Sequence, residues 1–322
     1  MAWRIIFMGS DPIALPMLEA IWDGRCGAVE FVAIYTQPDR PKGRGKKVVP
    51  NEIKVWALEH GIPVFQPEKM RKSDRLEIES MDVDAILVMA FGHMLSQELI
   101  DTPARGIWNL HTSLLPKYRG ASPIQCAVAS GDSETGASLM EVVREMDAGP
   151  VLNVEEIDID RLDTALSVDA KLAQACVPLV QRNLSLILEG KANPKEQNHA
   201  LASHVRKLSK EDGELDFSRF AGELAKRING LFPWPGTRIH HGDVAIKTGL
   251  ADYSNESQPG APGEVIGLEP DGLAVACGSG VLYLKRLQRP GGKMLEAPEF
   301  LRGYDLKPGE LLESRTMTEL IG

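Results

Sequence analysis

The sequence predicts an α/β fold, in which a doubly wound, mostly parallel sheet is followed by a second, smaller β-barrel domain. In the first half, nearly unbroken apolar runs alternate with amphipathic segments, the pattern of buried parallel strands joined by helices. In the last third, short strand-like runs alternate with tight turns. The chain has 322 residues, 43% of them hydrophobic and 25% charged, which is typical of about two globular domains.

The first domain is expected to span residues 1–190. Its apolar runs are short and rich in β-branched or aromatic residues, and they predict strands at 4–8, 31–35, 62–65 and 85–91. Helix-like spacing predicts helices at 12–22, 51–60, 68–80 and 164–189. Asn51 is suited to cap the second of these helices, Gly61 to end it, and Pro178 to bend the last one.

A polar segment at 191–207 predicts a linker, because it is nearly free of large apolar residues. The second domain, 208–322, is expected to contain a helix at 217–229 and then strands at 237–246, 263–268, 273–276 and 281–287. Tight turns are indicated by P-D-G at 270–272 and G-S-G at 278–280. Strands at this spacing suggest a small, partly open barrel, and oligonucleotide-binding (OB) barrels are one such architecture.

Composition and simple motifs exclude several classes of protein. The first strand is followed by G-S-D-P-I-A, which lacks the second and third glycines of a dinucleotide-binding loop. The four cysteines are scattered and form no C-x-x-C pair, and no H-E-x-x-H occurs, so we expect neither a disulfide framework nor a metal. No apolar run reaches the roughly 18 residues of a membrane span. We therefore expect a monomer in the cytoplasm, without a membrane partner.

The most informative segment runs from Asn109 to Pro123, N-L-H-T-S-L-L-P-K-Y-R-G-A-S-P, together with Asp147 further along. In an extended chain, Asn109 and His111 point to the same face. Acyl transfer to an amine needs hydrogen-bond donors for the oxyanion and an acceptor for a proton, which an amide, an imidazole and a carboxylate supply. On its own, however, N-x-H more often marks a structural histidine, and Asp147-Ala-Gly more often a turn.

The whole ordered set of motifs resembles the 10-formyltetrahydrofolate-dependent formyltransferases, and in particular the methionyl-tRNA formyltransferases along nearly the full chain. The matching pieces are F-M-G-S-D at 7–11, T-Q-P-D-R-P-K-G-R-G-K-K at 36–47, G-I-P-V-F-Q-P at 61–67, the 109–123 run, 136–152, and F-P-W-P at 232–235. The resemblance implies direct formyl transfer from 10-formyltetrahydrofolate to the amine of methionyl-initiator tRNA. It also implies a Rossmann-like catalytic domain.

The same resemblance implies site residues. Asn109, His111 and Asp147 would form the catalytic trio, with Asp147 as base, as orienter of His111, or both. The folate would contact Ser113, Leu114, Leu115 and Pro116. Phe91 follows the strongest predicted strand, where open α/β sheets bind ligands, and is a further candidate for the folate pocket; core packing is the alternative.

The net charge of −9 disfavours bulk binding to nucleic acid, but two basic clusters stand out. The segment 39–47 is expected to be a mobile loop, since its glycines and proline disfavour helix or strand; its cations are Arg40, Lys42, Arg44, Lys46 and Lys47. By resemblance this loop contacts the acceptor arm of the tRNA. A second cluster comprises Lys285, Arg286, Arg289 and Lys293. Two alternatives remain: a formyltransferase for an amino sugar or purine precursor, and a noncatalytic RNA-binding relative.

Overall fold

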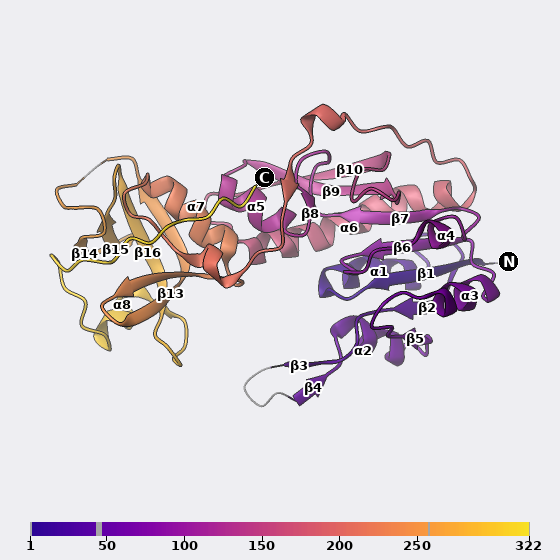
Figure 1. Ribbon diagram of the computed structural model, residues 1–322, viewed down its shortest axis with the longest axis horizontal. Coiled ribbons are helices and arrows are strands. Elements are labelled where there is room, and N and C mark those ends of the chain that lie inside the picture. The colour runs from indigo at the N-terminus through magenta and orange to yellow at the C-terminus, as the bar shows by residue number, and fades with distance from the viewer. Residues whose placement is uncertain (1, 43–46, 257, 322) are drawn as a thin grey trace. The chain divides into compact units, whose positions relative to one another are not determined.

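The computed structural model describes residues 2–42, 47–256 and 258–321. The chain forms two compact units (Figure 1). The first contains Met1–Arg119, Gly136–Ile157 and Ala170–Ala202, and the second contains Gly120–Thr135, Asp158–Asp169 and Ser203–Gly322. The first unit thus extends into the segment that was predicted to be a linker.

The first unit is built on a seven-stranded sheet in the order β10-β9-β7-β6-β1-β2-β5. Strand β1 pairs in parallel with β2 and β6, and β7 pairs in parallel with β6 but antiparallel with β9. This mostly parallel sheet confirms the predicted fold class. The strands are β1 (Trp3–Gly9), β2 (Val29–Tyr35), β5 (Val64–Phe65), β6 (Ala85–Met89), β7 (Ile107–His111), β9 (Glu134–Glu141) and β10 (Val151–Asp158).

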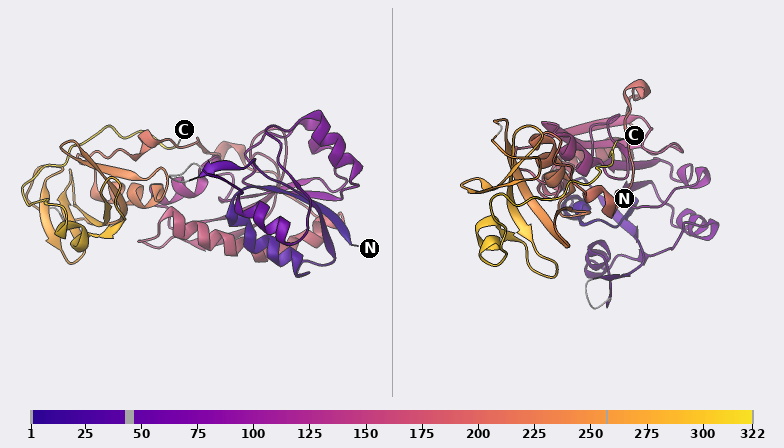
Figure 2. Two further views of the ribbon diagram at one scale, coloured as in Figure 1. Left: turned by 90° about the horizontal axis from the view of Figure 1, so that it is seen from below. Right: turned by 60° about the vertical axis from the view of Figure 1, so that its left-hand side comes forward.

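Helices cover both faces of this sheet (Figure 2). From β1 the chain moves to β2 and β5 at one edge of the sheet, and then returns to β6 on the other side of β1. With right-handed crossovers, this change of direction places α1 and α2 on one face and α3 on the other. The elements are η1 (Pro12–Ala14), α1 (Leu15–Trp22), α2 (Glu52–Glu59), α3 (Lys72–Ser80), α4 (Gln97–Ile100) and α6 (Ala165–Leu188). Helix α5 (Pro123–Ser130) belongs to the second unit. In the described ranges, every helix is too short or too polar to span a bilayer.

Local chemistry explains where these elements begin and end. The Asn51 side chain accepts a hydrogen bond from the backbone N–H of Lys54 and caps α2, as predicted, and Gly61 adopts a left-handed φ of 69° just beyond it. Helix α3 begins at Lys72, four residues later than predicted, where the Asp74 carboxylate accepts from the backbone N–H of Arg71. Strand β6 stops at Met89, since Ala90 has a positive φ of 49°.

The prediction that segment 39–47 cannot form a strand is wrong. Arg40–Lys42 (β3) and Lys47–Val49 (β4) pair as an antiparallel hairpin. Pro41 is tolerated because each strand of an isolated hairpin has a free edge, where no backbone donor is needed. The two glycines lie at 43 and 45, between the strands and outside the described residues.

The second unit contains an antiparallel sheet in the order β12-β13-β16-β15-β14, with β17 beside β16. Leu224 and Ile228 of α7 are fully buried in its core, together with Phe217 and Phe300. Helix α7 begins at Ala221, four residues later than predicted. The elements are β11 (His204–Val205), η3 (Lys210–Gly213), α7 (Ala221–Leu231), β12 (Thr237–His241), β13 (Val244–Ser254), β14 (Val265–Glu269), β15 (Gly272–Ala276), β16 (Val281–Gln288), β17 (Leu295–Glu296) and α8 (Ala297–Arg302). Strand β8 (Arg119–Gly120) lies at the boundary of the two units, and η2 (His199–Leu201) belongs to the first.

Candidate active site

Strand β7 carries two of the three predicted catalytic residues. It lies between β6 and β9, where Asn109 pairs with Val88 on one side and Met140 on the other. Leu110 is buried, and the alternation along the strand places Asn109 and His111 together on the opposite face. The extended conformation predicted for this segment is therefore confirmed. Asn109 is half-buried, whereas His111 is 7% exposed.

Hydrogen bonding determines which ring nitrogen of His111 carries a proton. Its Nε2 lies 2.9 Å from the backbone oxygen of Tyr118. A carbonyl oxygen only accepts, so Nε2 is the protonated nitrogen in either charge state of the ring. The other nitrogen, Nδ1, lies 3.7 Å from Oδ2 of Asp147. The imidazole therefore has one fixed edge and one edge that faces a carboxylate.

Asp147 sits in a tight turn between β9 and β10, and its side chain is 14% exposed. Its φ of 52° is left-handed, a region that few residues other than glycine adopt. Two residues on, a Cβ at Gly149 would lie 1.9 Å from the backbone oxygen of Glu141, so only glycine allows this approach. The turn thus brings Asp147 to His111, although 36 positions separate them in the sequence.

The predicted folate-binding turn follows β7 directly. Ser113 is fully buried, and its hydroxyl donates to the backbone oxygen of Lys117 at 2.6 Å. The Ser138 hydroxyl donates to the backbone oxygen of Ser113 and accepts from the backbone N–H of Leu115. Both hydroxyls therefore hold the turn, while Leu114, Leu115 and Pro116 are half-buried and present apolar surface.

Phe91, the other predicted folate residue, is 3% exposed and belongs to the core cluster that also contains Met8 and Ile86. Its ring meets His93 edge-on, with centroids 4.9 Å apart. The Nε2 atom of His93 is buried and has no hydrogen-bond partner in the described part of the chain. Sequence reasoning missed this histidine, and its only signal was its place directly after the apolar run of β6.

The β3–β4 hairpin carries part of the predicted RNA-binding cluster. Arg40 forms an ion pair with Glu68 at 2.8 Å, yet its side chain remains 63% exposed; Lys47 is also exposed. Arg44, Lys46 and the side chain of Lys42 lie outside the described residues.

At the base of the hairpin, Asp39 accepts hydrogen bonds from Lys54 at 2.7 Å and Gln66 at 2.8 Å. These bonds, that from Lys54 foremost, lower the pKa of the Asp39 carboxyl below its ordinary value. The single acid of the segment is therefore neutralised by a cation outside it.

The second basic cluster is partly neutralised within its own unit. Lys285 lies 3.8 Å from Asp271, and Arg286 pairs with Glu296 at 2.7 Å. Arg289 donates to the backbone oxygen of Gly303. This cluster consequently offers less unpaired positive charge than its sequence indicates.

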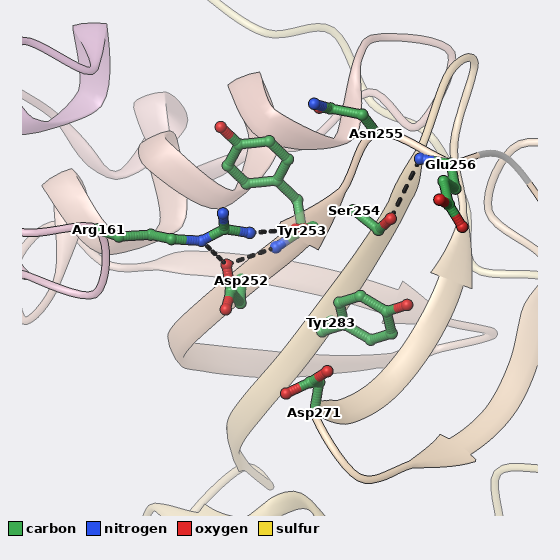
Figure 3. A pocket seen from close by; sticks show the side chains of 8 residues that line it. All are labelled: Arg161, Asp252, Tyr253, Ser254, Asn255, Glu256, Asp271 and Tyr283. Atoms are coloured by element: carbon green, nitrogen blue, oxygen red, sulfur yellow. Dashed lines mark hydrogen bonds and ion pairs between the residues drawn. The ribbon is translucent and has the colours of Figure 1, made fainter.

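A pocket of about 390 Å³ lies in the second unit (Figure 3). Arg161 donates to Asp252 Oδ1 at 2.8 Å, and its guanidinium carbon lies 4.8 Å from the centroid of the Tyr253 ring. Three carboxylates against one guanidinium make this pocket unsuited to a phosphate-bearing ligand. It contains none of the predicted site residues, and its lining comprises Arg161, Asp252, Tyr253, Ser254, Asn255, Glu256, Asp271 and Tyr283.

Comparison with protein families gives two matches. The formyl transferase model matches residues 3–182, and the model of the formyl transferase C-terminal domain matches residues 207–305. The chain is 38% identical over 310 residues to the methionyl-tRNA formyltransferase of Citrifermentans bemidjiense, covering 96% of each chain. It is 40% identical over 293 residues to that of Pseudomonas putida, covering 91% of this chain and 93% of the relative.

Solved structures share the fold at lower identity. A sugar 3N-formyl transferase, WlaRD, solved in the presence of dTDP and 5-N-formyl-THF, has a TM-score of 0.65 at 16% identity, covering 90% of this chain and 98% of its own. HypX from Aquifex aeolicus in complex with tetrahydrofolic acid has a TM-score of 0.61 at 16% identity, covering 98% of this chain and 51% of its own. The fold is thus that of formyl-transferring enzymes.

Proposed function

Because this chain belongs to the formyl transferase family, we propose that it transfers the formyl group of 10-formyltetrahydrofolate to the amino group of methionyl-initiator tRNA. The observation that carries this proposal is the similarity to methionyl-tRNA formyltransferases across both domains, at 36–40% identity over nearly the whole chain. The product, N-formylmethionyl-tRNA, serves the initiation of translation.

The catalytic roles are assigned to Asn109, His111 and Asp147. The methionyl amine attacks the formyl carbon, whose oxygen takes up negative charge. The bond from that carbon to N10 of the folate then breaks, and N10 accepts a proton, which leaves tetrahydrofolate. Asn109 and His111 lie on one face of β7 and supply hydrogen-bond donors to the developing oxyanion. In the described part of the chain, no side-chain hydrogen bond engages the Asn109 amide.

His111 donates to the oxyanion through Nδ1, because its Nε2–H is already engaged by Tyr118. In that role Nδ1 carries a hydrogen, and the Asp147 carboxylate lies 3.7 Å from the same nitrogen. Asp147 also receives a proton from the methionyl ammonium through a water molecule, which leaves the neutral amine free to attack. In this proposal Asp147 is both orienter and base.

The folate is proposed to lie against the turn formed by Leu114, Leu115 and Pro116, whose half-buried apolar atoms suit the flat face of a pterin ring. Phe91 supports the pocket from the core rather than touching the ligand, since it is only 3% exposed. Ser113 acts through the shape of the turn, because its hydroxyl is used by Lys117. The buried Nε2 atom of His93, which has no hydrogen-bond partner among the described residues, is a further candidate for contact with the folate.

The tRNA is proposed to contact the β3–β4 hairpin through phosphate oxygens. The exposed side chains of Arg40 and Lys47 support this placement. Arg44, which lies outside the described residues, is the principal candidate in the sequence of this segment. We also propose that the protein acts in the cytoplasm as a monomer, for which light scattering at micromolar concentration is the test.

One assay separates this function from its alternatives. The protein is incubated with 10-formyltetrahydrofolate and, in parallel, with methionyl-initiator tRNA, uncharged tRNA, a nucleotide-linked amino sugar or a purine-precursor amine. Formylmethionyl-tRNA alone is expected. A formylated sugar or purine precursor would favour one of the other formyltransferases, and RNA binding without any product would favour a noncatalytic relative.

A further inference from the structure

A buried glutamine holds the turn that carries Asp147. Gln197 is 8% exposed, and its side-chain nitrogen donates to the backbone oxygen of Asp147 at 2.9 Å and to that of Gly149 at 2.7 Å. One amide group therefore spans the turn on both sides of Ala148. Gln197 belongs to the segment that the sequence predicted to be a linker.

A buried arginine in turn fixes the glutamine. Arg119 is 2% exposed, and its Nε and Nη2 atoms donate to Oε1 of Gln197 at 3.1 and 2.7 Å. An arginine has no acceptor, so this fork settles which end of the Gln197 amide is oxygen and which is nitrogen. Nη2 also lies 3.1 Å from Nδ1 of His199, and Nη1 lies 3.8 Å from the Glu145 carboxylate.

The neighbouring residue holds the other half of the catalytic pair. The backbone oxygen of Tyr118, directly before Arg119, accepts the hydrogen bond of His111 Nε2. The dipeptide Tyr118-Arg119 thus holds both partners. The backbone oxygen of Tyr118 fixes the His111 ring, and the Arg119 side chain fixes the Asp147 turn through Gln197. We propose that Arg119 and Gln197 are positioning residues that set the separation between Asp147 and His111.

This inference rests on the proposed catalytic roles of His111 and Asp147. Asp147 needs such support because its φ of 52° is unfavourable for a residue with a side chain. Its carboxylate faces the His111 ring, while its backbone oxygen accepts from Gln197. Glu145 and His199 contact Arg119, which holds Gln197. A shift of about 1 Å in a reacting group is enough to slow a reaction by about a hundredfold.

The sharpest test is Gln197→Glu. A carboxylate of the same shape still accepts from Arg119, but it cannot donate to the backbone oxygens of Asp147 and Gly149. We expect Gln197→Glu to fold and to keep its folate binding stoichiometry, but at a lower melting temperature, because a carboxylate oxygen would face those two backbone oxygens. Its kcat should fall about tenfold or more, with the KM for folate and for tRNA changed by less than about twofold.

Gln197→Ala and Arg119→Lys are the second pair of variants, and Asn183→Ala is the matched control. Asn183 is 3% exposed; it donates to the backbone oxygen of Leu179 and accepts from the Asn153 side chain, so its hydrogen bonds involve neither Gln197 nor Asp147. Its loss should lower the melting temperature without changing the kcat of the folded fraction. If Gln197→Glu keeps the parent kcat, or loses it only in step with lost folding as the control does, the inference is overturned.

A double-mutant cycle separates this inference from the proposed function. If Gln197 acts through Asp147, Gln197→Glu should cause almost no further loss of kcat in an Asp147→Asn background. Losses that multiply would show that Gln197 acts independently and would refute the inference. If Asp147→Asn alone retains the parent kcat, the proposed role of Asp147 fails instead.

Discussion

The Nδ1 atom of His111 lies 3.7 Å from the Oδ2 atom of Asp147, while the opposite ring nitrogen is held by the backbone oxygen of Tyr118. The pair therefore combines a ring of fixed orientation with a carboxylate that faces its free nitrogen. A protonated ring in this position is attracted to the carboxylate and can donate to an oxyanion, which neither residue achieves alone.

Replacing either member of the pair should abolish most of the turnover. We expect His111→Asn and Asp147→Asn to lower kcat by about a hundredfold or more, because each removes a group that stabilises or deprotonates the reacting atoms. Steady-state formylation of methionyl-tRNA at saturating folate is the measurement. Near-parent turnover in one variant would remove that residue from the mechanism.

The hairpin should act on tRNA and not on folate. We expect Arg44→Ala to lower kcat/KM for methionyl-tRNA and to flatten its dependence on salt, since a phosphate contact releases counterions that the variant no longer displaces. Folate affinity should stay unchanged. Arg286→Ala is the control, because Arg286 is already paired with Glu296. Equal formylation by Arg44→Ala and the parent at subsaturating tRNA would contradict this role.

The second unit should be sensitive to acid through Asp212, which is 1% exposed. Burial raises the pKa of its carboxyl, but hydrogen bonds from Arg206, Thr318 and the backbone N–H of Ser209 outweigh burial and hold the pKa well below its ordinary value. A carboxyl with a lowered pKa in the folded state stabilises the fold at pH values above its unfolded pKa, about 3.9, and loses that contribution as the pH falls further.

We therefore expect Asp212→Asn to lower the free energy of unfolding by about 2 kcal/mol at pH 7. The difference from the parent should shrink below about pH 4, where the parent carboxyl starts to lose its advantage. Urea titrations at both pH values measure this, with Asp305→Asn as the control, since its ion pair with Lys307 is largely exposed. A difference that does not depend on pH would show that the Asp212 charge is not responsible.

The four cysteines should be unreactive until the chain unfolds. All are buried and outside disulfides, and burial raises the pKa of Cys26 to about 11 and those of Cys126 and Cys277 to about 12. The thiolate is the reactive form, so at pH 8 these thiols should react with a disulfide reagent far more slowly than free cysteine. Four equivalents should react in 6 M guanidinium chloride. Rapid labelling of the native protein would indicate frequent local opening.

Sequence periodicity was enough to predict strand β7, but not β9 and β10, between which the Asp147 turn lies. The run I-W-N-L-H alternates, and β7 places Asn109 and His111 as that alternation requires. The four apolar runs likewise correspond to β1, β2, β5 and β6, because burial on both faces leaves a signal within the strand itself.

Contacts between distant segments left no comparable signal. Gln197 lies 50 positions from Asp147, in a polar stretch that composition alone assigns to a linker. Gln197 is buried because the fold places this segment beside the Asp147 turn, and not because of the residues next to it in the sequence. The β3–β4 hairpin was missed for a related reason. Pro41 and two glycines made a strand look unfavourable, but each strand of the hairpin is stabilised by pairing with the other.

Gly149→Ala should show whether the Asp147 turn tolerates movement. The added methyl group would lie 1.9 Å from the backbone oxygen of Glu141, so the turn must shift. We expect a loss of about 1–3 kcal/mol in the free energy of unfolding and a fall in kcat of about tenfold or more as the Asp147 carboxylate leaves its place beside His111. Gly303→Ala is the control, because a Cβ there would meet its nearest atom at 3.9 Å. Parent-like kcat in Gly149→Ala, despite lower stability, would mean that the reaction does not depend on the position of this turn.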